Sequence, residues 1–128
     1  MGDSIKAIQD RDLFSEGSAI VIGGSGGIGK AICETFAACG VPIIFTYHKN
    51  QKAAMELKHR INESGGEAAF SQLELTNKKQ VEDFCQSLEG TMIHSIINAT
   101  GSDIRMKWIS ELSYEEWDDV MRTDADGF

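Results

Sequence analysis

The chain has 128 residues, enough for one domain with a sizeable core and too few for two typical domains. Its 12 basic and 20 acidic residues give a formal charge of −8, which repels phosphate backbones and anionic lipid headgroups. Composition therefore excludes nucleic acid and membranes as expected partners. No apolar run reaches the length of a membrane span and the first residues lack a signal-peptide core, so we expect a cytoplasmic protein.

Residues 18–22 lean apolar and run into a glycine cluster that opens an amphipathic segment. This pattern predicts a strand, a tight turn and a helix that ends at Gly40. The predicted inner face of the helix consists of Ile28, Ala31, Ile32, Thr35, Phe36 and Cys39. Residues 1–12 are polar and without a period, so we expect a loosely ordered lead-in to a domain over residues 13–128.

The next strand and helix are marked by their flanking residues. Pro42 precedes the apolar run 43–47, which predicts a strand buried on both faces. Asn50 can cap the following helix, whose end is marked by two glycines at 65–66. Its predicted inner face is Ala53, Ala54, Leu57 and Ile61.

Two more strands and two more helices follow. Residues 67–75 and 91–98 predict strands; Thr76 or Asn77 can cap the helix between them. A capping-box pattern at Ser113 predicts the start of a last helix. The buried candidates are Ala69, Phe70, Leu73 and Leu75 in the third strand, Val81, Phe84, Cys85 and Leu88 in the third helix, and Trp117, Val120 and Met121 in the last.

Strand and helix thus alternate four times without a repeat or a linker. This order predicts an α/β fold: a doubly wound parallel sheet of the Rossmann type in a three-layer α/β/α arrangement, truncated after the fourth strand and the following helix. Ligands of such sheets bind at the carboxyl ends of the strands.

The glycine cluster satisfies two spacings, GxGxxG at Gly24, Gly26 and Gly29, and GxxxGxG at Gly23, Gly27 and Gly29. Glycines leave backbone amides accessible at a helix start, where an anion binds. Between a strand and a helix this pattern predicts a dinucleotide pyrophosphate site, with a flexible turn without ligand as the alternative. The predicted contacts are Gly23, Gly24, Ser25, Gly26, Gly27, Ile28 and Gly29.

The end of the second strand predicts the choice of cofactor. An acidic side chain there binds a free ribose 2′-hydroxyl, whereas a 2′-phosphate needs cations. The sequence has Tyr47, His48 and Lys49 at this point and no acid. We therefore expect NADPH to be preferred and NAD to be the less favoured cofactor. The alternative is that Lys49 is a solvated lysine at a helix start.

The three cysteines, Cys33, Cys39 and Cys85, fall in predicted helices without a CxxC spacing. We expect reduced, mostly packed thiols and no metal site. Metal ligation by these cysteines together with the three histidines is the alternative.

Residues 22–29 resemble the TGxxxGxG turn of the short-chain dehydrogenase/reductase family, most closely its ketoacyl-carrier-protein-reductase-like members. Two further segments are similar: residues 74–77 resemble a family segment whose first two residues, here Glu74 and Leu75, meet the adenine. Residues 97–101 resemble a turn by the adenosine ribose, which implies contacts from Asn98 and Ala99. The helix from Ser113 is similar to one on which many members dimerise, which implies a homo-oligomer.

Several positions depart from the family pattern. Ile22 replaces a threonine, and Gly26 stands where many NADP-dependent members carry a basic residue. Asp124 stands where the family has a catalytic asparagine, and its helical spacing from Trp117 directs it inward. A buried carboxylate should be paired, hydrogen-bonded or protonated. The alternative is that the helix ends earlier and Asp124 is solvated.

The resemblance implies a serine and a Tyr-x-x-x-Lys pair for catalysis, yet neither Tyr47 nor Tyr114 has a lysine four residues on. We therefore interpret the chain as the cofactor-binding half of an NADPH-dependent reductase. Its substrate would be a small-molecule or acyl-thioester carbonyl, and the 128-residue chain alone would be inactive. A non-catalytic nucleotide-binding or regulatory subunit is one alternative, and a fragment that folds only against a partner chain is another.

Overall fold

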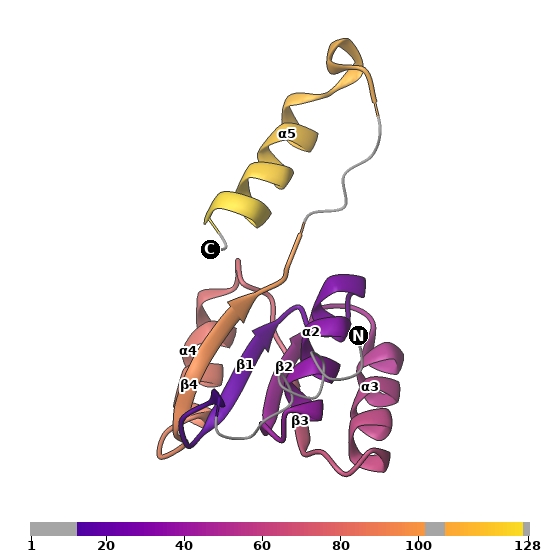
Figure 1. The fold of residues 1–128 in the computed structure, drawn as a ribbon. Helices are drawn as coiled ribbons and strands as arrows, with labels where there is room; N and C mark the ends of the chain where they lie inside the picture. Colours follow the sequence, from indigo (N-terminus) through magenta and orange to yellow (C-terminus); the bar gives the residue numbers. More distant parts are fainter. Residues whose placement is uncertain (1–12, 102–106, 127–128) are drawn as a thin grey trace.

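The computed structural model describes residues 13–101 and 107–126. The expected lead-in, residues 1–12, lies outside the described residues. The elements are, in chain order, β1 (Ser18–Ile22), α2 (Gly27–Ala38), β2 (Ile43–Tyr47), α3 (Gln51–Glu63), β3 (Ala68–Gln72), α4 (Lys78–Ser87), β4 (Ile93–Asn98), the 3₁₀ turn η2 (Ile109–Glu111), α5 (Tyr114–Met121) and the π-helical turn η3 (Arg122–Asp126) (Figure 1).

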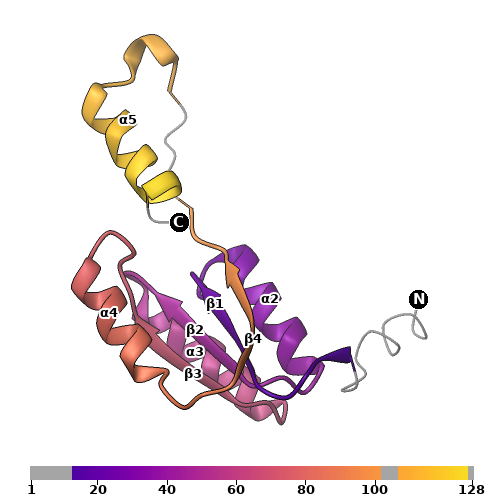
Figure 2. The ribbon, with the colours of Figure 1, turned by 90° about the vertical axis from the view of Figure 1, so that its left-hand side faces the viewer.

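The four strands form one parallel sheet in the order β3-β2-β1-β4. Helices α2 and α3 cover one face and α4 covers the other, which confirms the predicted doubly wound arrangement (Figures 1 and 2). The chain runs from β1 outward to β3 and then crosses to the other side of β1. The glycine turn after β1 therefore lies at the point where the strand order reverses, which is where such folds bind ligands.

The larger core lies between the sheet and helices α2 and α3. Small residues of α2, Cys33 and Ala37, are buried there beside Leu57 and Ile61 of α3. The aromatic ring of Phe45 in β2 is fully buried and lies 5.6 Å from that of Phe70. Fully burying one Leu, Ile or Phe side chain stabilises a fold by about 1.5–3 kcal/mol, and this face buries more such side chains than the other face does.

The predicted inner face of α2 is partly wrong. Ile28, Ala31 and Thr35 are exposed, and the helix instead buries Gly29, Cys33 and Ala37. These residues are spaced four apart and so lie on one stripe of the helix. Their small size lets the helix axis approach the sheet closely. A prediction that follows the largest apolar residues rotates the helix away from this contact.

The α4 face holds a smaller core of Ile20, Leu73 and Phe84, with Val81 and Leu88 packed against it. Two predicted core residues are not part of it: Cys85 and Ala69 are exposed. Cys85 lies just beside the narrow apolar stripe of α4. Ala69 pairs with Ile44 and is on the outermost strand of the sheet, at the margin of what α4 covers.

Helix α5 stands apart from the sheet, beyond the carboxyl end of β4 (Figures 1 and 2). The predicted capping box is present, because Ser113 accepts from the Glu116 amide and the Glu116 side chain accepts from the Ser113 amide. The predicted inward face is wrong for this structure: none of the residues of α5 is buried, and Trp117 and Met121 are 51% and 42% exposed.

Candidate nucleotide-binding site

The glycine turn is hydrogen-bonded to the end of β2. The Gly23 amide donates to the Thr46 hydroxyl at 3.1 Å, and the Gly24 amide donates to the Thr46 carbonyl at 2.9 Å. Thr46 is the buried polar residue of the core, and this bond satisfies its hydroxyl as an acceptor. These two amides are therefore used within the protein and do not face a ligand.

Three of the glycines are required by close packing. A Cβ on Gly24 would lie 2.6 Å from Cβ of Phe45, and one on Gly29 would overlap the Gly23 carbonyl. Gly23 has a φ of +79°, which favours glycine, and a Cβ there would meet the Ala99 carbonyl at 3.1 Å. These positions shape the turn whether or not a ligand binds.

Gly27 differs from these three because a Cβ there would meet nothing within 4 Å. It is the first residue of α2, whose N-cap Gly26 makes no side-chain capping bond, whereas Asn50 and Asn77 cap α3 and α4. Within the described residues, no backbone acceptor pairs with the amides of Gly27 and Ile28. The first amides of a helix carry a partial positive charge, so this open helix start fits the phosphates of a dinucleotide.

The three residues predicted at the end of β2 are placed differently from one another. Tyr47 is 8% exposed, and its ring packs against the edge of Phe70 in the core. His48 and Lys49 are exposed at the carboxyl edge of the sheet. The His48 carbonyl accepts a hydrogen bond from Nε2 of Gln72 at 2.9 Å, which ties this turn to β3.

The structure adds an acid to this turn that the local sequence lacks. Oε2 of Glu74, after β3, lies 3.9 Å from Nε2 of His48. The family resemblance predicted Glu74 at the site only as a contact of the adenine, not as a neighbour of His48. Its approach to His48 depends on the register of β2 and β3, and no local pattern reports it. Leu75, the other predicted adenine contact, packs partly buried against the α4 core.

The end of β4 lies beside the glycine turn. The Ala99 amide donates to the Ile22 carbonyl at 2.8 Å. Oδ1 of Asn98 accepts from both the amide and the hydroxyl of Thr100, at 3.1 and 2.7 Å. The Asn98 side chain thus orders its own turn, and Ala99 lies beside Gly23.

Asp124 is not directed into a core. Helix α5 ends at Met121, and Asp124 lies exposed in the π-helical turn η3. The spacing argument assumed that a regular helix continues through residue 124. A π turn changes the number of residues per turn, so the Asp124 carboxylate is not on the side of the helix that carries Trp117.

Two groups have shifted pKa values. Burial, with the nearby charge of Glu34, raises the pKa of Cys33 to about 12. Cys33 is therefore a neutral packing residue beside Gly24. Hydrogen bonds from Lys107 and from the Ser113 backbone lower the pKa of Glu116 to about 2. This pair stabilises the start of α5 and is not part of the glycine turn.

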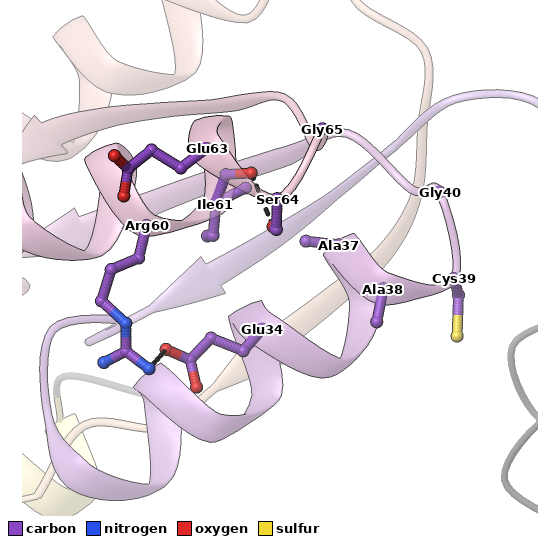
Figure 3. Close-up of a pocket in the computed structure, with 10 residues that line it drawn as sticks. All are labelled: Glu34, Ala37, Ala38, Cys39, Gly40, Arg60, Ile61, Glu63, Ser64 and Gly65. Carbon is purple, nitrogen blue, oxygen red and sulfur yellow. Dashed lines mark hydrogen bonds and ion pairs between the residues drawn. The ribbon is translucent and has the colours of Figure 1, made fainter.

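A groove of about 760 Å³ lies elsewhere, between the carboxyl-terminal ends of α2 and α3 (Figure 3). Arg60 and Glu34 form an ion pair of 2.7 Å across it. It shares no lining residue with the predicted site.

Among the described residues no group of three histidine, cysteine or carboxylate side chains is placed to hold a metal ion, and no helix is long and apolar enough to span a membrane.

The parallel sheet with its glycine turn defines a protein of the Rossmann class. Residues 18–128 match the family described as short chain dehydrogenase. Since this match covers most of the chain, the protein belongs to the short-chain dehydrogenase family.

Curated relatives agree. A short-chain type dehydrogenase/reductase from Picea abies is 29% identical over 118 residues, which cover 85% of this chain and 44% of the relative. Glucose 1-dehydrogenase 2 from Bacillus subtilis (strain 168) is 29% identical over 120 residues, 91% of this chain and 46% of the relative. The chain thus spans less than half the length of these two proteins.

Solved structures show the same fold. A double mutant of a Serratia marcescens short-chain dehydrogenase/reductase has a TM-score of 0.78 at 21% identity, over 88% of this chain and 46% of that one. Acetoin dehydrogenase from Enterobacter cloacae has a TM-score of 0.74 at 19% identity, over 88% and 45%. At these identities the likeness concerns the fold alone.

Proposed function

We propose that residues 13–128 are the cofactor-binding half of an NADPH-dependent oxidoreductase. The complete enzyme would reduce a carbonyl, ketoacyl or similar, to an alcohol, and would act as a homo-oligomer. The observation that carries the proposal is the start of α2, where the amides of Gly27 and Ile28 are open and Gly27 has free space around it. Family membership supports the class of reaction.

The residues of this half would hold the cofactor by its phosphates and its adenosine end. The amides at the start of α2 would bind the pyrophosphate, and Lys49 with His48 would bind the 2′-phosphate. Leu75 and Ala99 lie at the neighbouring strand ends, where the adenosine is expected. When bound, the nicotinamide ring supplies the hydride, and this chain contributes the position of the cofactor.

Reduction also needs a proton donor, and this chain has no suitable tyrosine. Tyr47 is buried in the core, whereas Tyr114 is 78% exposed on α5, and neither is followed by a lysine four residues on. We propose that the 128-residue chain binds cofactor and does not reduce carbonyls by itself. Asp124 does not replace the tyrosine, because its charge would oppose a developing alkoxide.

The substitution Gly27→Val tests the phosphate site. Gly27→Val places methyl groups over the open amides, and the loss of two charge-assisted hydrogen bonds, about 1.5–3 kcal/mol each, should weaken NADPH binding more than a hundredfold. The matched control is Ala38→Val, an exposed position at the other end of the same helix. Titration calorimetry measures affinity, and circular dichroism reports folding. Unchanged affinity in a folded Gly27→Val protein would refute the proposal.

Lysine 49 tests the choice of cofactor. Lys49→Ala should cost about 1–3 kcal/mol of NADPH binding and little of NADH binding, because only NADPH carries the 2′-phosphate. The control is Lys52→Ala, which removes an exposed cation on α3. Equal affinity of the unmutated protein for NADPH and NADH would contradict the preference.

A further inference from the structure

The ends of β2 and β3 are joined so that a carboxylate lies beside the proposed 2′-phosphate site. Glu74 Oε2 is 3.9 Å from His48 Nε2, and the two side chains are 45% and 52% exposed. Glu74 brings a carboxylate to this turn, and His48 carries a charge only when protonated. The turn that was expected to lack an acid therefore has one, supplied by the neighbouring strand.

Glu74 is held in this place by several bonds. The Thr76 hydroxyl donates to Oε1 of Glu74 at 3.0 Å, and the Glu74 amide donates to Oε1 of Gln80 at 2.9 Å. The Leu73 amide donates to the Tyr47 carbonyl at 2.9 Å, which continues the pairing of the two strands past their ends. The Glu74 side chain is thus oriented by Thr76 in its own turn, and its backbone is held by Gln80 at the start of α4.

A carboxylate in this position distinguishes the two forms of the cofactor. It repels a 2′-phosphate, and it accepts a hydrogen bond from a free 2′-hydroxyl. Lys49 acts in the opposite direction, because its ammonium attracts the phosphate. Glu74 and Lys49 would therefore act in opposite directions on a ribose bound at this edge of the sheet.

We infer that Glu74 is a specificity-determining residue that limits the preference of this protein for NADPH over NADH. The inference rests on the proposed function, because it assigns Glu74 to the same cofactor site. A like charge near a half-exposed site changes a dissociation constant by about threefold to tenfold after screening by solvent. The protein then prefers NADPH and retains measurable binding of NADH.

The test is Glu74→Gln, which removes the charge and keeps an acceptor for Thr76. Calorimetric titration with NADPH and with NADH should show the ratio of the two affinities rise by about threefold to tenfold, mainly through tighter NADPH binding. The rise should shrink in high salt, where exposed charges are screened. Glu74→Ala should shift the ratio in the same direction, which separates charge from local folding.

The matched control is Glu89→Gln, which removes the same charge from an exposed position after α4, at the opposite edge of the sheet. It should leave the ratio unchanged. An unchanged ratio in Glu74→Gln, with both cofactors bound, would overturn this inference and leave the proposed function standing. Failure of the unmutated protein to bind either cofactor would overturn the proposed function and this inference with it.

Discussion

Two regions of this molecule both contain large apolar side chains but bury them to very different extents. Under α2 and α3, residues such as Leu57 and Ile61 are 1% exposed, whereas Ile96 of β4 and Trp117 of α5 are 71% and 51% exposed. β1 and β2 have a strand on each side, and β4 pairs with β1 alone among the described strands. Burial here follows the number of packed neighbours and not hydrophobicity, so apolar pattern alone does not locate the core.

An isoleucine pair gives the largest test of this difference. Ile61→Ala should lower the free energy of unfolding by about 2–5 kcal/mol, because it leaves a cavity in a closed core. Ile96→Ala should change it by less than about 0.5 kcal/mol, because the side chain is exposed. Denaturant unfolding measures both. A large cost for Ile96→Ala would show that β4 is covered in solution, by a second copy or by α5.

The glycine turn sharpens the comparison within the packed region. Gly24→Ala should destabilise the protein by about 1–3 kcal/mol, since the new Cβ overlaps Phe45. Gly27→Ala should be neutral or stabilising by up to about 1 kcal/mol, because alanine favours a helix and meets no neighbour. Thermal unfolding of the two variants compares them directly. Equal destabilisation would mean that Gly27 is also a packing residue.

The open region should depend on local charges, and this is the smallest expected effect. The pKa of Glu116 falls from an ordinary value of 4.5 to about 2 in the folded chain. The stabilisation of the start of α5 by ionised Glu116 is therefore present above about pH 4.5 and is lost as the pH falls towards 2. The protection of the α5 amides from hydrogen exchange, compared at each pH with the rate expected for an unfolded chain, should decline between pH 5 and 2. Glu116→Gln should remove the pH dependence, and its persistence there would contradict the assignment.

Much of the fold was predictable because its signals are local. Asn50, Asn77 and Ser113 cap their helices as their positions predict. Each strand forms within its predicted run, although β3 ends at Gln72, before Leu73 and Leu75. The side of α2 that faces the sheet was mispredicted, because its contact stripe consists of small residues such as Cys33 and Ala37. A prediction from hydrophobic periodicity is dominated by large apolar residues and gives little weight to small ones.

The site was predictable in part for the same reason. The glycine turn is a local motif, and the parallel pairing of β1 with β4 places the end of β4 beside it. The approach of Glu74 to His48 depends on strand register and loop geometry, which residue spacing does not specify. The exposed position of Asp124 depends on a π turn that no residue pattern in that segment indicated.

Amide chemical shifts on titration with NADPH test the central claim most directly, that the open start of α2 binds the phosphates of a dinucleotide. In ¹⁵N-labelled protein, the amides of Gly27 and Ile28 should show the largest changes, and the amide of Ala38 at the other end of the helix should stay in place. Changes confined to residues of the groove between α2 and α3, such as Glu34 and Arg60, would contradict the account.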